Sequence, residues 1–189
     1  MPELPEVETV RRGLVPRLVG RRIVRLPQRR RDLRLPLPPR FAQRVEGRTV
    51  LGIDRRAKYL LVRLDDGHTL IVHLGMSGRM TLHEAASAAE HPLQWHDHVV
   101  IDLEDGWQVR FNDARRFGLM LLVRNETVAD HKLFKGLGPE PLDATFDGPA
   151  LARRLKARRT PIKAALLDQK TLVGIGNIYA CEGIGRAHV

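Results

Sequence analysis

Short runs of β-branched and apolar residues, separated by turns, fill the segment between Arg21 and Val123 and constrain the fold more than any other feature. The runs are Arg21–Leu26, Thr49–Asp54, Tyr59–Leu64, Thr69–Leu74, Val99–Leu103, Gln108–Phe111 and Leu119–Val123. Acidic residues followed by a glycine, Gly67 or Gly106, stand at two of the joints and are a common hairpin signal. Many short strands at close spacing favour an antiparallel sandwich or barrel.

Helical patterns flank this β region on both sides. Before it, apolar residues recur at helical spacing from Val7 to Val19 and the pattern stops at Gly20, although Pro16 weakens its last turn. After Gly138, helical patterning returns at 147–156, with either Asp147 or Gly148 as its start, at 162–168 and from about residue 176 onward.

The order of these patterns predicts an α+β chain. We expect an N-terminal helix and an antiparallel β-sandwich domain over residues 1–125, a linker over 126–146, and an incomplete helical domain over 147–189.

The charge balance favours a nucleic-acid partner. The 189 residues contain 32 Lys and Arg against 22 Asp and Glu, so the formal net charge is +10, which indicates a polyanionic ligand. A ribosomal or generic RNA-binding protein has the same balance. The single cysteine, Cys181, excludes an internal disulfide and a C-x-x-C zinc pair within these residues. An acidic N-terminus and the lack of a long apolar stretch lead us to expect a soluble, cytoplasmic protein and a monomer.

Pro2 and Glu3 are the first candidate catalytic residues. A small second residue such as Pro2 allows removal of Met1, and this exposes a secondary amine whose ordinary pKa, about 8, leaves a neutral fraction at physiological pH. Such an amine can attack C1′ of a deoxyribose and form an iminium ion. Glu3 is placed to donate or accept a proton. An N-terminal proline is also common in proteins without such chemistry, so the pair alone does not decide the matter.

A basic cluster and two loop tips are the next candidates. Lys58 follows two arginines at the entrance to an apolar strand, and alternation with Tyr59 directs it toward a groove, although an exposed edge-strand lysine is the simpler reading. Met76 lies on one predicted loop tip, and Arg115 and Phe117 lie on another. An arginine beside an aromatic residue can fill the void that an extruded nucleotide leaves, whereas a turn with a buried Phe is the alternative.

Other polar residues fit contacts with phosphates. In the His96-Asp97-His98 sequence no third metal ligand lies nearby, so we favour a phosphate contact for His96, or simple strand alternation, over a metal. Arg158 and Lys163 lead a helix with positive charge. The glycine-rich turn before Asn177 opens the last helix, and its backbone amides favour an anion, here a phosphodiester.

Taken together and in this order, these motifs resemble those of the formamidopyrimidine-DNA glycosylase (MutM) family over essentially the whole chain. The resemblance implies a bifunctional enzyme that excises oxidised purines such as 8-oxoguanine and formamidopyrimidines from duplex DNA and then cuts the strand by β,δ-elimination. It also implies that the helical part is of the helix-two-turn-helix type.

The resemblance assigns each candidate a role. Pro2 would be the Schiff-base nucleophile, Glu3 the proton donor and Lys58 the lysine that acts in elimination. The residues that would fill the void left by the flipped nucleotide are Met76, Arg115 and Phe117. The residues that would bind DNA are His96, Arg115, Arg158, Lys163 and Asn177, with Arg158 standing where related sequences often carry lysine.

The end of the sequence departs from the family pattern. Full-length members continue into a four-cysteine zinc finger, so zinc is expected in those proteins, whereas these residues imply no metal and no cofactor. Gly183 and Gly185 also fall where the last helix should continue. We therefore expect an apparent truncation before the zinc finger and weak binding to damaged duplex, because phosphate contacts supply much of DNA affinity.

Two other functions remain open at this point. A basic nucleic-acid-binding module without catalysis fits the charge, and it would bind DNA without forming a covalent adduct. A tautomerase that uses an N-terminal proline as base is the third possibility, and it would show no dependence on DNA. The basic chain and the downstream motifs speak against the tautomerase.

Overall fold

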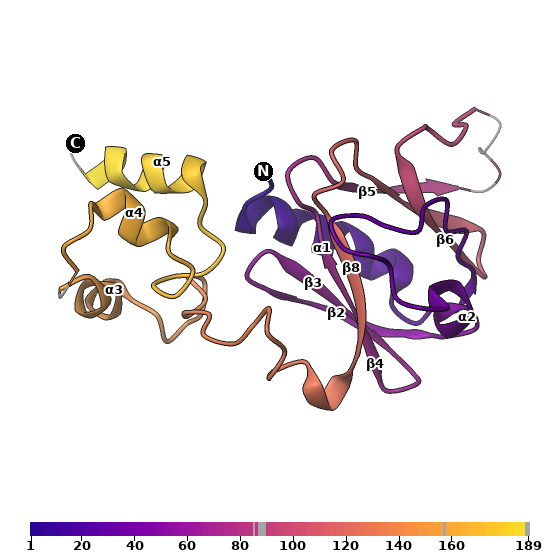
Figure 1. Ribbon diagram of the computed structural model, residues 1–189, viewed down its shortest axis with the longest axis horizontal. Helices are drawn as coiled ribbons and strands as arrows, with labels where there is room; N and C mark the ends of the chain where they lie inside the picture. The colour runs from indigo at the N-terminus through magenta and orange to yellow at the C-terminus, as the bar shows by residue number, and fades with distance from the viewer. Residues whose placement is uncertain (85, 87–89, 157, 188–189) are drawn as a thin grey trace.

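The computed structural model describes residues 1–84, 86, 90–156 and 158–187, and two antiparallel sheets form its larger part (Figure 1). The first sheet has the order β1-β6-β7-β5, from β1 (Ile23–Arg25), β6 (Asp97–Leu103), β7 (Trp107–Asn112) and β5 (Arg79–Glu84). The second has the order β2-β3-β4-β8, from β2 (Val50–Arg56), β3 (Tyr59–Leu64), β4 (His68–His73) and β8 (Leu119–Arg124). The predicted antiparallel sandwich is confirmed.

The core lies between the two sheets and under the N-terminal helix. Along β3, the side chains of Leu60, Val62 and Leu64 are at most 3% exposed, while Arg63 between them faces solvent, as expected for a strand with one buried face. Phe111 on β7 belongs to the same hydrophobic cluster. Burying apolar surface at about 25 cal/mol per Å² is what holds the two sheets together.

Helix α1 (Leu4–Leu18) begins earlier than the apolar pattern indicated. A carboxylate oxygen of Glu6 accepts a hydrogen bond from the Glu3 backbone N–H at 3.0 Å, so that the helix starts directly after Glu3. At the other end the helix passes through Pro16 to Leu18, and Gly20, with a φ of 79°, turns the chain.

The sequence prediction did not include strand β5 or the short helix α2 (Phe41–Val45). Within the described residues, strand β5 pairs with β7 alone and lies at the edge of its sheet, so its sequence mixes polar and apolar residues instead of forming an apolar run. Helix α2 has five residues, too few for a periodic pattern.

The remaining elements follow β8 and form a separate helical layer, drawn in orange and yellow in Figure 1. They are α3 (Gly148–Leu155), α4 (Ile162–Leu167) and α5 (Asn177–Ala187), whereas the short turn η2 (Asn125–Thr127) lies at the end of β8, beside the sandwich. Asp147 caps α3, because its side chain accepts a hydrogen bond from Ala150 N at 2.8 Å. Helix α5 continues through Gly183 and Gly185, which face open space. In the described part of the chain, no helix combines the length and apolar character that crossing a bilayer requires.

Candidate active site

A cleft of about 480 Å³ lies where the sandwich, the N-terminus and the helical layer meet. Lys58, Tyr59 and His73 line it from the sandwich, and Gln169, Gly176 and Asn177 line it from the helical layer, together with Met1, Arg34, Ala57, Leu137, Leu167 and Ile175. The N-terminus of α1 points toward the helical layer at this place (Figure 1). The structure therefore brings the start of the chain, Lys58 and Asn177 to one cavity.

Glu3 is buried, with 2% of its surface exposed, and connects α1 to the start of α5. Its carboxylate accepts hydrogen bonds from the backbone N–H groups of Gly176 at 2.8 Å, Ile178 at 2.8 Å and Tyr179 at 3.1 Å. These donors are the unpaired amides at a helix N-terminus, which favour a negative charge. The expectation that this turn holds a phosphodiester with its amides is corrected, since the anion there is the Glu3 side chain.

Gly176 allows the close approach of Glu3. A Cβ atom at this position would lie 2.5 Å from Cδ of Glu3, far inside a normal contact distance. Any side chain there would push the carboxylate away from the α5 amides. The glycine-rich turn thus leaves room for the Glu3 carboxylate at the N-terminus of α5. This role follows from the tertiary contact and not from the motif.

Lys58 lies in the turn between β2 and β3, not on a strand, and only 7% of its surface is exposed. The reading as an exposed edge-strand lysine is therefore wrong, and so is the argument from strand alternation, although the side chain does line the cleft. Burial lowers the pKa of Lys58, and the nearby charges of Glu3 and Glu6 oppose this shift. A larger share of the amine is then neutral at physiological pH than for an ordinary lysine.

His73 was not identified from the sequence, yet it lines the cleft beside Lys58. It ends β4, its Nδ1 accepts a hydrogen bond from Gly75 N at 2.9 Å, and its ring packs against that of Tyr59 with centroids 4.7 Å apart and ring planes tilted by 51°. The sequence signal that could have identified His73 is its position as a polar residue at the end of a strand, directly before a loop tip. Burial, and next the charges of Lys58 and Arg34, lower the pKa of His73 to about 4, so the imidazole is neutral at physiological pH.

This shift predicts a pH dependence of stability. The unfolded chain takes up a proton at His73 near pH 6.5, whereas the folded chain does so near pH 4. The free energy of unfolding should therefore fall as the pH drops from 6.5 to 4, by roughly 2 to 3 kcal/mol from this residue. Urea midpoints of the wild type and of His73→Asn, which keeps an acceptor but does not titrate, measure the effect. Parallel pH profiles of the two proteins would contradict it.

Two loop tips carry the residues expected to fill the void beside a flipped nucleotide. Met76 and Phe117 are 42% and 43% exposed and line a second cavity with Met1, next to the cleft. The guanidinium carbon of Arg115 lies 4.8 Å from the centre of the Phe117 ring. The structure thus brings these three side chains together on one surface, near the start of the chain.

A buried carboxylate, Asp113, holds the two loop tips in register. One of its oxygens accepts a hydrogen bond from the Ser77 hydroxyl at 2.6 Å, and the other accepts from Gly118 N at 2.8 Å. Gly75 permits the close packing, because a Cβ there would lie 2.3 Å from the carbonyl carbon of Phe117. These contacts give the two loops a fixed relative position.

The other predicted phosphate ligands are spread more widely. Asn177 is exposed at the start of α5 and lines the cleft. Arg158 donates to the Asp168 carboxylate at 2.7 Å, so it is already ion-paired. Lys163 is half-buried on α4, and His96, directly before β6, has its ring 6.1 Å from that of His98 and does not line the cleft.

No metal site is evident in the described ranges, where no group of three or more His, Cys, Asp and Glu side chains could hold an ion. The full sequence contains one cysteine, so the residues present do not fit a four-cysteine zinc site.

Comparisons with known proteins identify one family. Residues 1–120 match the model of the formamidopyrimidine-DNA glycosylase N-terminal domain, and residues 137–189 match that of the formamidopyrimidine-DNA glycosylase H2TH domain. Formamidopyrimidine-DNA glycosylase of Cereibacter sphaeroides is 56% identical over 99% of this chain and 68% of its own length. The same enzyme of Rhodospirillum rubrum is 53% identical over the whole chain and 66% of its own length.

Solved structures lead to the same family. The Lactococcus lactis formamidopyrimidine-DNA glycosylase bound to DNA with an abasic site superposes with a TM-score of 0.80 at 35% identity, over 94% of this chain and 66% of that one. The same protein bound to DNA with an N7-benzyl-Fapy-dG lesion gives 0.80 at 36% identity, over 94% and 64%. The chain spans about two thirds of the length of these relatives. It belongs to the formamidopyrimidine-DNA glycosylase family of DNA-repair enzymes.

Proposed function

We propose that this chain is a base-excision-repair glycosylase and abasic-site lyase that removes oxidised purines from duplex DNA through the amine of Pro2. The observation that carries the proposal is the convergence of the N-terminus and Lys58 on one cleft, beside loop tips that expose Met76 and Phe117. The buried Glu3 lies directly behind this cleft, where its carboxylate accepts from Gly176 N. Relatives with the same fold are bound to abasic and lesion-containing DNA. The net charge of +10 suits such a partner.

In this proposal the chemistry begins with Pro2. Once Met1 is removed, the lone pair of the Pro2 nitrogen attacks C1′ of the damaged nucleotide and the bond to the base breaks. The sugar ring then opens and leaves an iminium ion between the Pro2 nitrogen and C1′. This cation withdraws electrons from C2′, so a proton is lost there and the 3′ phosphate departs in β-elimination; a second elimination releases the 5′ phosphate.

Glu3 and Lys58 would move the protons of these steps. The Glu3 carboxylate, held by three α5 amides, would exchange a proton with the sugar. Lys58, whose pKa is lowered by burial, is more often neutral than an exposed lysine and can take up the proton from C2′.

Borohydride trapping tests the proposal. The 189-residue chain is incubated with a duplex that contains one 8-oxoguanine, and sodium borohydride reduces any iminium to a stable protein–DNA adduct. We expect an adduct with the damaged duplex and none with the undamaged control. A chain that binds the damaged duplex to saturation without forming an adduct, either with it or with an abasic duplex, would instead be the non-catalytic nucleic-acid-binding module.

The organisation of the chain and its setting are part of the proposal. We divide the chain into a catalytic sandwich domain at 1–125, a linker at 126–146 and a helical DNA-binding domain at 147–189. The division is supported by the end of β8 at Arg124 and the start of α3 at Gly148. We further infer a cytoplasmic monomer, because a DNA substrate and a single cysteine suit a reducing compartment.

A further inference from the structure

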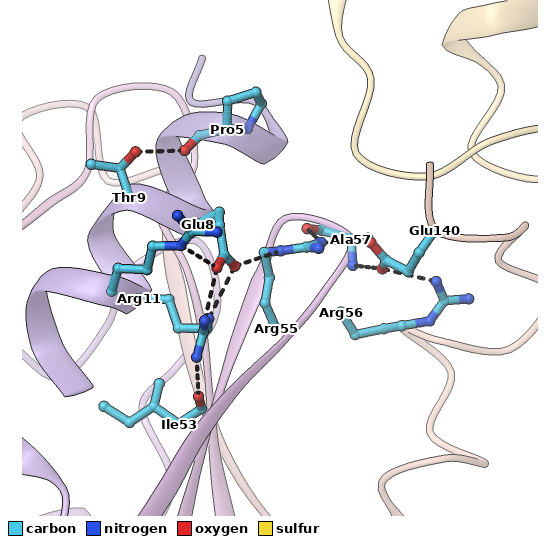
Figure 2. Close-up of polar contacts among 10 residues, drawn as sticks. Pro5, Glu8, Thr9, Arg11, Ile53, Arg55, Arg56, Ala57 and Glu140 are labelled. Carbon is cyan, nitrogen blue, oxygen red and sulfur yellow. Dashed lines mark hydrogen bonds and ion pairs between the residues drawn. The ribbon is translucent and has the colours of Figure 1, made fainter. Parts of the chain in front are cut away.

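The linker residue Glu140 binds the turn that carries Lys58. Figure 2 shows its carboxylate between the turn and two arginines of β2. One oxygen accepts hydrogen bonds from Ala57 N at 2.7 Å and from Nη1 of Arg56 at 3.0 Å, and the other accepts from Nη1 of Arg55 at 2.7 Å. A single carboxylate therefore satisfies two guanidinium groups and one backbone amide.

Arg55 continues this network to α1. Its Nε donates to the Glu8 carboxylate at 3.2 Å, and its Nη1 also donates to the Ala57 carbonyl at 2.9 Å (Figure 2). Glu8 in turn accepts hydrogen bonds from Arg11 and Arg12. The bond from Arg11 is the main cause that lowers the pKa of Glu8 to about 2, so this carboxylate keeps its charge at physiological pH.

The turn needs such support because of its backbone conformation. Ala57 has a φ of 52°, in the left-handed region that residues other than glycine rarely adopt. Glu140, from the linker, binds the N–H group of this strained residue, and Arg55, from β2 of the same hairpin, binds its carbonyl group. The next residue is Lys58, whose side chain lines the cleft.

The same network reaches the helical layer. Nη2 of Arg56 donates to the Gly138 carbonyl at 2.7 Å, and Gly138 N donates to the Gln169 carbonyl at 2.8 Å. The Gln169 side chain accepts from Gly174 N at 2.9 Å, and the Gly174 carbonyl accepts from Leu4 N at 3.0 Å. Hydrogen bonds thus connect the Lys58 turn with the loop that leads into α5 and with the start of α1 beside Glu3.

These ion pairs differ from ordinary surface salt bridges. An exposed pair contributes little, because water screens it and both side chains lose freedom. Here the side chains of Arg55 and Glu140 are only 10% and 19% exposed, and a backbone amide shares the carboxylate. Hydrogen bonds to a charged group in such surroundings are short and directional.

We propose that Glu140 is a positioning residue that holds the Ala57-Lys58 turn against the helical layer and so keeps the Lys58 amine in the cleft. The reaction that Lys58 serves rests on the proposed function, whereas the mechanical part of the proposal does not. Glu140 touches no substrate atom in this account and acts through Lys58.

Cleavage of an abasic duplex tests the first part. With protein in saturating excess, Glu140→Gln should lower the single-turnover rate of strand cleavage by about tenfold or more, while the yield of borohydride adduct stays within about twofold, because Pro2 is untouched. Asp102→Asn is the matched control, because it also neutralises a carboxylate that pairs with an arginine. The Asp102 side chain is 18% exposed and pairs with Arg25 in the first sheet, away from the Lys58 turn. An equal loss of cleavage and adduct in Glu140→Gln would overturn the proposal.

A double-mutant cycle separates positioning from general damage. If Glu140 acts through Lys58, adding Glu140→Gln to Lys58→Ala should change the remaining cleavage rate by less than about twofold. Independent, multiplying effects of the two substitutions would overturn the proposal. Should Glu140→Gln fail to fold, Arg56→Gln removes only the bond to Gly138 and one of the three donors to Glu140. It should slow cleavage severalfold with the adduct yield retained, and an unchanged rate would contradict the proposal.

Amide hydrogen exchange tests the mechanical part without any enzymatic activity. Exchange at the amides of residues 55–60 should become at least about tenfold faster in Glu140→Gln, and it should stay at the wild-type rate in Asp102→Asn. Unchanged exchange in Glu140→Gln would show that the turn does not depend on Glu140. If the wild-type chain neither cleaves DNA nor forms an adduct, the proposed function fails for this chain, and the exchange rates still decide the role of Glu140.

Discussion

Replacing Pro2 with glycine is expected to lower the rate of covalent adduct formation with an 8-oxoguanine duplex by on the order of a hundredfold or more. Proline supplies a secondary amine, whose product with C1′ is an iminium ion that is cationic without protonation. Glycine supplies a primary amine on a freely rotating backbone, and its imine must first gain a proton to withdraw electrons. The rate is measured by quenching single-turnover reactions with borohydride at fixed times.

DNA binding provides the control for this substitution. Pro2 is a half-buried residue in front of α1, and its replacement leaves the Glu3 contacts to α5 in place. Fluorescence anisotropy with a non-cleavable abasic analogue should therefore give an affinity within about twofold of the wild type. A glycine variant that forms the adduct at the wild-type rate would exclude Pro2 as the nucleophile. A chain that retains Met1 should form no adduct, since its secondary amine is then an amide.

Replacing Glu3 with glutamine should have a double effect, on stability and on chemistry. A glutamine amide has one oxygen in place of two, so its NH2 group would face an N–H donor of α5 and leave that donor unsatisfied. Losing a buried, charge-assisted contact of this kind should cost about 2 to 4 kcal/mol of unfolding free energy. Excision should also slow by roughly a hundredfold to ten-thousandfold, the range for loss of a general acid or base.

Two measurements and one control variant separate these effects. Urea unfolding gives the stability, and single-turnover excision at a temperature where both proteins are folded gives the rate. Glu46→Gln is the control, because Glu46 accepts one backbone hydrogen bond, from Leu26 N at 2.8 Å, and lies away from the cleft. It should cost less than about 1 kcal/mol and leave the rate unchanged. A Glu3→Gln protein as stable as the wild type would show that α5 does not depend on this carboxylate.

The structure places some of the residues predicted from motifs close together at the cleft and others away from it. Lys58 and Asn177 line one cleft, and Glu3 contacts Gly176 in its wall. Met76, Arg115 and Phe117 form one exposed surface next to it. These residues could be selected because each lies in a local motif and the order of the motifs resembles that of one family, although the local reading of Lys58 as a strand residue was wrong. Arg158 forms an ion pair with Asp168, and this partner could not be read from a motif because only the folded loop brings the two charges together.

Other parts of the site depend on contacts between distant segments. In the sequence, His73 looked like the end of an ordinary strand. Its pKa is lowered because the fold buries the imidazole and brings the positive charges of Lys58 and Arg34 near it. Glu140 lies 83 residues from Ala57 in sequence, and no periodic pattern joins them. The Gly176 turn looked like an anion site for DNA, and the structure places the Glu3 carboxylate there.

The sequence by itself determined the sandwich, because alternation along strands and apolar spacing along helices are local properties that each segment carries wherever it packs. Strand β3 was predicted with the bounds that the structure has, from Tyr59 to Leu64, whereas the edge strand β5, which pairs on one side only, was missed. Only the tertiary structure decided how Lys58 is held. The Glu140 carboxylate binds two guanidinium groups and a backbone amide, and these hydrogen bonds can form only when the linker packs against the β2–β3 hairpin.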